Sequence, residues 1–230
     1  MPKSRVILAC IVGILVLPAS ASASWGSHCT NHLPHCYALA YWPMEKAGEE
    51  VKGLSSNIYT TAMNVPDWNA EGENFVSNEE WAKFPLDHEY WVEAGQIAGG
   101  VTESNNIMHW FYAWDNSTGL HRYFSPYRVE GYTWNTYTLT STGKESWCAT
   151  IGSTQVSCGL SGVGNVSKEV EVGMEATGET EPENSGHDQT SVQHMNGNWY
   201  HWNEADWWTE SHTCVSLYEW IAGNINFGTC

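Results

Sequence analysis

The chain has 230 residues, with 26 Asp and Glu against 9 Lys and Arg and a formal net charge of −17. Such an acidic chain repels nucleic acids and anionic membranes, which argues against both as partners. Because 13% of the residues are aromatic and 42% are hydrophobic, the composition also excludes a disordered acidic tail and suits one folded domain.

Residues 1–23 have the pattern of a secretory signal. Lys3 and Arg5 precede the apolar run 6–17, and Ala21-Ser22-Ala23 offers a small-residue cleavage site. The apolar run is shorter than the roughly 20 residues needed to cross a bilayer. We therefore expect a secreted, extracellular protein without a membrane anchor.

Six cysteines remain after the signal, which in an oxidising compartment predicts disulfide bonds. Sequence leaves the pairing open, but three pairs are close neighbours along the chain: Cys29 with Cys36, Cys148 with Cys158, and Cys214 with Cys230. The segment HCTNHLPHC, which contains the first pair, could instead ligate zinc. Structural zinc sites prefer tighter cysteine spacing, so we expect disulfides and no metal.

The rest of the chain is typical of an all-β protein, because Gly, Asn, Ser and Thr interrupt short apolar segments about every ten residues. Residues 24–84 are less regular and are expected to wrap a single β domain formed by residues 85–230. The pattern predicts an antiparallel two-sheet β-sandwich, a concanavalin-like jelly roll, stapled by disulfides. The candidate strands are Tyr90–Ala98, Ile107–Trp114, Tyr132–Ser141, Ser146–Ile151, Thr154–Cys158, Val170–Thr177 and Trp199–Trp202.

Two of these candidate strands carry carboxylates. In an extended segment alternate residues share a face, so Glu93 lies on one face of a strand that is apolar on both faces. The segment 170–177 places Glu171, Gly173 and Glu175 on one face, opposite an apolar one. A glycine within a strand often marks the close approach of another backbone or of a ligand.

These carboxylates have two interpretations. A carboxylate in an apolar pocket, or beside a second one, holds its proton more tightly, so that two such groups can act as general acid and general base. Alternatively, Glu171 and Glu175 line the solvent face of a half-buried antiparallel sheet. Pattern alone leaves both interpretations open.

The stretch WVEAGQI, followed by HWFYAWDNSTG, resembles the neprosin-type glutamic peptidases, and the later VEVGME is similar to a second element of that family. The fungal eqolisins are more distantly similar, with Gln in place of the first Glu. The resemblance covers about residues 85–210. It places Glu93 at the first catalytic position and Glu171 at the second by register, with Glu175 as a rival for that position.

The resemblance implies a secreted hydrolase that cleaves peptides at acidic pH with a carboxylate pair, without metal, cofactor or covalent intermediate. One ionised Glu would take a proton from water, and its protonated partner would polarise the scissile carbonyl. We expect a monomer with peptide or glycan as its substrate. Four aromatic residues near the first motif are expected to bind substrate: Trp91, Trp110, Tyr112 and Trp114.

The abundant tryptophans favour an alternative function. A carboxylate pair in an aromatic cleft also suits a glycoside hydrolase, in which a separation near 5 Å implies retention of configuration. A lectin-like or catalytically inactive relative would need the aromatic rings but neither acid. The segment WYHWNEADWW supplies further rings that either stack on sugars or fill the core.

Overall fold

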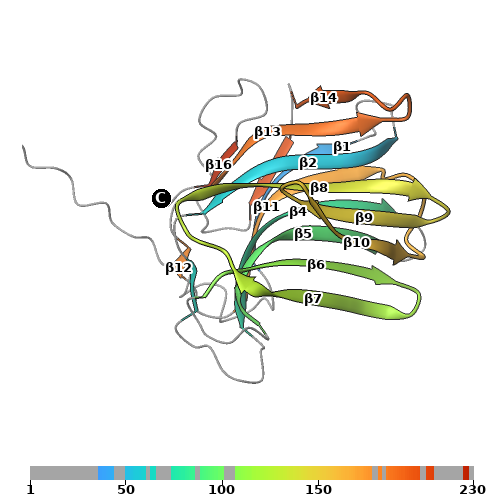
Figure 1. Cartoon of the computed structure of the whole chain (residues 1–230). Helices are drawn as coiled ribbons and strands as arrows, with labels where there is room; N and C mark the ends of the chain where they lie inside the picture. Colours follow the sequence, from blue (N-terminus) through green and yellow to red (C-terminus); the bar gives the residue numbers. More distant parts are fainter. Residues whose placement is uncertain are drawn as a thin grey trace, which may run out of the picture.

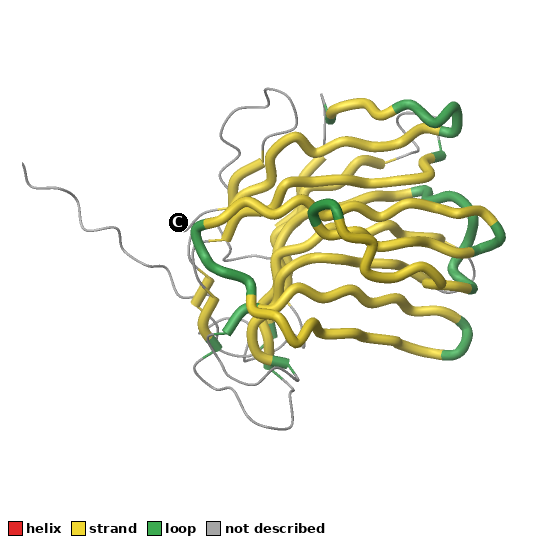
Figure 2. Tube along the Cα trace, in the orientation of Figure 1, coloured by secondary structure: helices red, strands yellow, loops and turns green. Residues whose placement is uncertain are grey.

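The computed structural model describes residues 36–43, 50–60, 63–65, 74–85, 89–100, 107–177, 181–182, 185–202, 206–209 and 225–227. Within these ranges the chain forms strands, turns and loops and no helix (Figure 2). The part of the chain that the structure describes therefore contains no helix that could cross a membrane. The strands form two large antiparallel sheets (Figure 1), which confirms the predicted all-β sandwich.

The first sheet has seven strands, and every neighbouring pair is antiparallel. Its order is β15 (Asp206–Thr209), β1 (Cys36–Pro43), β11 (Glu169–Ala176), β4 (Phe75–Pro85), β5 (Glu89–Gly99), β6 (His109–Asn116) and β7 (Gly119–Arg128). The strands β11, β4 and β5 occupy its centre.

The main path of the second sheet has six strands, in the order β10 (Thr154–Ser161), β9 (Ser146–Ile151), β8 (Thr133–Gly143), β2 (Val51–Thr60), β13 (Ser185–His194) and β14 (Trp199–His201). A further strand, β16 (Ile225–Phe227), also pairs with β13. Two short strands, β3 (Met63–Asn64) and β12 (Glu181–Pro182), pair separately.

The core lies between the two large sheets, where each strand presents its apolar face. Alternate residues of β11, from Val170 to Ala176, are fully buried there, as are Leu54 and Ile58 of β2. Trp147 of β9 packs edge-on against Phe84 of β4, with ring centroids 5.3 Å apart. The period of two in strands therefore leaves the other face of each sheet for polar residues and function.

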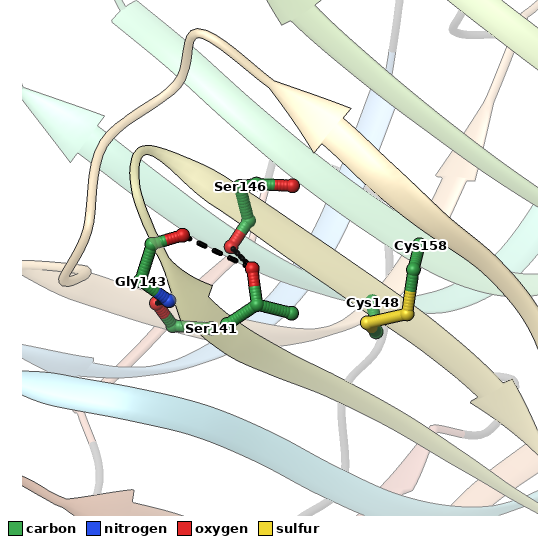
Figure 3. Close-up of a disulfide and its surroundings, with 6 residues drawn as sticks. Ser141, Gly143, Ser146, Cys148 and Cys158 are labelled. Carbon is green, nitrogen blue, oxygen red and sulfur yellow. Dashed lines mark hydrogen bonds between the residues drawn. A yellow bond between two sulfur atoms is a disulfide. The ribbon is translucent and has the colours of Figure 1, made fainter.

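The hairpin of β9 and β10 confirms one predicted disulfide. Cys148 and Cys158 are directly opposite each other in the register, and a disulfide joins them (Figure 3). The other cysteine predictions cannot be compared with the structure, because residues 29, 214 and 230 lie outside the described residues, as do residues 1–23 and the histidines of the zinc alternative.

The segment 24–84 differs from the expectation that it wraps a domain beginning at residue 85. It contributes β1 and β4 to the first sheet and β2 to the middle of the second. These strands escaped sequence analysis because Gly53, Ser55 and Ser56 interrupt the apolar pattern of β2, while Asn78, Glu79 and Glu80 give β4 the composition of a loop. Both sheets would lack central strands without this segment.

Candidate active site

Three glutamates from the three central strands meet on the outer face of the first sheet, the face that points away from the core. They are Glu79 of β4, Glu93 of β5 and Glu175 of β11, and one carboxylate oxygen of each lies within 4.8 Å of the others. All three side chains are buried. The structure thus brings together two of the three predicted acids and adds a third, Glu79.

Strand register explains why Glu79 lies at the centre of this cluster. On β4, Trp81 is opposite Glu93 and Ser77 is opposite Glu175, so Glu79 lies midway along the diagonal between the two acids. The residues directly opposite Glu79 are Gly95 on β5 and Gly173 on β11, neither of which has a side chain. The outer carboxylates can therefore extend toward Glu79 over bare backbone.

The two glycines are required by close packing. A Cβ added to Gly95 would lie 2.4 Å from the Cβ of Glu79, and one added to Gly173 would lie 2.0 Å from the carbonyl oxygen of Ala38. Gly173 also has φ of +157°, which other residues rarely adopt. The glycine noted in the sequence as a sign of close approach does mark one, to the neighbouring strand β1.

Burial shifts the proton equilibria of the cluster. Desolvation raises the pKa of Glu93 to about 8, with a further increase from the charge of Glu175, while hydrogen bonds from the indoles of Trp81 and Trp91 oppose the rise. Desolvation also holds the pKa of Glu79 well above its ordinary value, with Glu93 and Glu175 adding to it. The cluster therefore retains protons at pH values where exposed carboxyls are ionised.

Each acid has hydrogen-bonding neighbours that fix its position. Ser77 donates its hydroxyl proton to Oε1 of Glu79, and Oε2 of Glu79 is buried without a hydrogen-bond partner. Tyr37 of β1 forms a hydrogen bond with Glu175, and its own pKa is raised, first by burial and then by the Glu175 charge. Tyr37 therefore stays protonated and donates a hydrogen bond to the carboxylate of Glu175.

Glu171, the second predicted acid by register, makes a different interaction. Nζ of Lys83 lies 2.7 Å from Oε1 of Glu171 and 3.6 Å from Oε1 of Glu169. Burial raises the pKa of Glu171 to about 7, and Lys83 opposes the rise. Glu171 is opposite Trp81 on one side of β4 and Glu93 is opposite Trp81 on the other, so about 10 Å of sheet separates their backbones.

The four predicted substrate-binding aromatics lie on two faces. Trp91 shares the outer face with Glu93 and forms a hydrogen bond with it. Tyr112 is buried in the core, and Trp110 and Trp114 pack against that core from the same side of β6. The structure thus separates these three rings from the carboxylates, because Ala113 is the residue of β6 that lies opposite Glu93.

The cluster also has the composition of a cation site. Three carboxylate oxygens within 4.8 Å of one another are the donors that hard divalent ions prefer. A cation there would compete with protons for the carboxylates of Glu79 and Glu93, because both carboxylates have raised pKa values. Acidic conditions therefore favour the protonated cluster over a metal-bound one.

Sequence analysis missed Glu79, Trp81, Tyr37 and Lys83, all of which lie on β1 and β4. A usable signal was present in SNEEW, where Glu79 and Trp81 alternate with Ser77 at the period of a strand. The neighbouring Asn78 and Glu80 obscured it, since both are polar and yet face the core.

Comparison with solved structures shows that this fold is shared with glutamic peptidases. Scytalido-glutamic peptidase with a peptide-based transition state analog has a TM-score of 0.58 and 11% identity, over 86% of this chain and 98% of that one. A second structure of that peptidase, with a transition state analog inhibitor, has a TM-score of 0.59 and 12% identity, over 85% and 98%. SCP-B, a member of the eqolisin family, in complex with the tripeptide Ala-Ile-His, has a TM-score of 0.55 and 11% identity, over 86% and 98%.

These similarities show an eqolisin-like fold. The sequence resemblance to neprosins stays a prediction. No protein-family model matches the chain. No curated protein sequence is significantly similar to it.

Proposed function

We propose that this protein is an exported glutamic peptidase that uses Glu93 and Glu175 as its catalytic pair. The observation that carries the proposal is the buried cluster of Glu79, Glu93 and Glu175, in which two raised pKa values coexist with a hydrogen-bonded third carboxylate. The eqolisin-like fold supports a peptide substrate. The disulfide between Cys148 and Cys158 supports an oxidising, extracellular compartment.

The roles follow from the surroundings of each acid. Glu175, held by the hydrogen bond from Tyr37, acts as the base and takes a proton from water as the water oxygen attacks the scissile carbonyl. Glu93, protonated because burial raises its pKa to about 8, gives its proton to the carbonyl oxygen. Glu175 then passes its proton to the leaving nitrogen, the C–N bond breaks, and Glu93 recovers a proton from the hydroxyl of the new acid.

This mechanism predicts the alkaline limit of activity. Glu93 can donate only while it holds its proton, so the rate should fall as the pH rises through about 8. The sequence suggested an acidic optimum; the burial of Glu93 extends the expected active range toward neutrality.

The test is casein cleavage by the full chain and by three glutamine variants. Glu93→Gln and Glu175→Gln should each reduce the rate by about 10²- to 10⁴-fold, the usual contribution of general acid–base catalysis. Glu171→Gln should keep activity within a few fold of the wild type, because the Glu171 carboxylate is paired with Lys83. Exposed Glu130 provides the matched control, Glu130→Gln, and tryptophan emission checks that each variant is folded.

The outcomes separate the alternatives. Full activity of Glu93→Gln would exclude the mechanism altogether. Loss of activity in Glu171→Gln, with Glu175→Gln still active, would instead make Glu93 and Glu171 the pair. Inhibition by a chelating agent that added metal ions reverse would show that the carboxylates hold a catalytic cation.

A retaining glycoside hydrolase is the second candidate. The observation in its favour is that carboxylate oxygens of Glu93 and Glu175 lie within 4.8 Å of each other, the short separation that retaining enzymes need. Release of sugars from a polysaccharide, with no cleavage of casein and with loss of the reaction in Glu93→Gln, would support it over the peptidase. A folded protein inactive on both substrates would be a binding relative.

A further inference from the structure

The outer face of the second sheet carries exposed aromatic rings, whereas the carboxylate cluster belongs to the first sheet. Trp134 of β8 is 52% exposed, and Trp199 of β14 is 41% exposed. This face is formed by β14, β13, β2 and β8, which lie side by side in Figure 1. Single exposed rings need no explanation, but these two are held in specific positions.

Trp134 is supported by a neighbouring ring. It lies opposite Tyr59 of β2 in the register, and the two ring centroids are 5.0 Å apart with an interplanar angle of 34°. The pair therefore makes a rigid aromatic platform at one end of the face, with Trp134 outermost. Large rings lose little conformational entropy when a ligand binds to them.

Trp199 reaches across the other end of the same face. Its side chain starts on the edge strand β14 and crosses β13 to reach Gly53 of β2. A Cβ added to Gly53 would lie 3.0 Å from Cη2 of Trp199. The absence of a side chain at Gly53 is what lets the indole rest on the sheet. The two platforms rest on β2 at Tyr59, beside Trp134, and at Gly53, beneath Trp199. These two positions are six residues apart on β2, or roughly 20 Å.

Between the platforms the face is polar and almost uncharged. Hydroxyl and amide groups bridge β2 and β8: Ser55 and Thr138 hydroxyls are 2.9 Å apart, and Thr136 donates to Asn57 at 2.6 Å. Two acidic or basic side chains stand at the outward-facing described positions of the four strands, Asp188 of β13 and His201 of β14. A neutral face on a protein of net charge −17 does not suit an ionic partner.

Flat rings at the two ends and neutral hydroxyls and amides between them are complementary to a chain of sugars. The C–H faces of sugar rings pack on aromatic rings, and their hydroxyls exchange hydrogen bonds with Ser, Thr and Asn. We propose that the outer face of the second sheet, with Trp134 and Trp199 as its platforms, binds a neutral polysaccharide. This site is independent of the carboxylate cluster, so it would tether the protein to a glycan whatever bond the cluster hydrolyses.

The experiment is retention of the full chain on insoluble cellulose, xylan and mannan, measured as protein left in solution. We expect binding to at least one of these, unchanged at high salt because the face is neutral. Trp134→Ala and Trp199→Ala should each weaken retention by about tenfold, the effect of losing one aromatic contact. Tyr127→Ala, which removes a 71% exposed ring from β7 of the first sheet, should bind like the wild type.

Hydrolysis and retention, measured on the same variant, keep this proposal separate from the proposed function. Glu93→Gln should reduce hydrolysis by about 10²- to 10⁴-fold yet leave retention unchanged. Wild-type protein that stays in solution with all three polysaccharides, or equal retention of the ring variants, would overturn the proposal. A wild-type dimer that Trp134→Ala dissociates, without retention on any glycan, would overturn it too and identify the face as an interface between copies of this chain.

Discussion

The free energy of unfolding should fall as the pH rises, and Glu93 should account for a measurable part of that fall. Burial raises the pKa of Glu93 from 4.5 to about 8. Between these values the folded protein keeps the Glu93 proton while the unfolded chain releases it. Each pH unit in that interval therefore lowers the free energy of unfolding by about 1.4 kcal/mol, and the whole interval by roughly 5 kcal/mol.

Glu93→Gln tests this reasoning because glutamine has the shape of the carboxylic acid but does not titrate. We expect urea unfolding, followed by tryptophan emission from about pH 5 to about pH 8, to show a shallower decline for this variant. The difference in slope should be about 1.4 kcal/mol per pH unit. The wild type should keep a steeper decline, to which the raised pKa values of Glu79 and Glu171 also contribute.

The matched control is Glu130→Gln, which removes the same charge from an exposed side chain. This control measures how much is gained by removing one negative charge from a protein of net charge −17. Its free energy of unfolding, plotted against pH, should run parallel to that of the wild type. If the Glu93→Gln curve is also parallel to the wild type, Glu93 is not protonated in the folded protein. That result would remove the basis for its role as a general acid.

Three other changes have defined consequences. Gly173→Ala should lower the free energy of unfolding by about 1–3 kcal/mol more than Gly119→Ala, measured by urea titration. Both glycines have positive φ, but only a Cβ added at Gly173 would lie within 4 Å of other atoms. Equal losses in the two variants would contradict the close packing at Gly173. Serine at both Cys148 and Cys158 should cost about 2–3 kcal/mol by opening the hairpin loop, measured by thermal unfolding with reduced wild type as the reference. Tyr37→Phe should reduce casein cleavage about tenfold or more through loss of the hydrogen bond to the proposed base, and an unchanged rate would show that this bond is dispensable.

Local pattern was enough to predict much of the β domain. Strand β9 has the predicted bounds, and β5, β6, β8, β10 and β11 differ from prediction by a few residues at their ends. The disulfide of the β9–β10 hairpin was also predictable, because a short turn places Cys148 opposite Cys158. These features depend on residues near one another in sequence, where the period of two and turn composition are strong signals.

The acids were predictable as residues but not as a cluster. Alternation placed Glu93, Glu171 and Glu175 on strand faces, and it offered no way to choose between the last two. The choice depends on β4, whose Lys83 binds Glu171 and whose Glu79 lies between Glu93 and Glu175. That strand has the composition of a loop, so its place between β5 and β11 follows from long-range pairing.

The sequence by itself determined the acidic character of the chain, the alternation of its strands and the hairpin that the disulfide closes, because each is a property of composition or of neighbouring residues. The tertiary structure alone decided which face each aromatic ring occupies and which carboxylates lie within 4.8 Å of one another. The physical reason is that desolvation and charge repulsion act through space: the pKa of Glu93 depends on burial and on Glu175, which is 82 residues away in the chain but on the same face of one sheet.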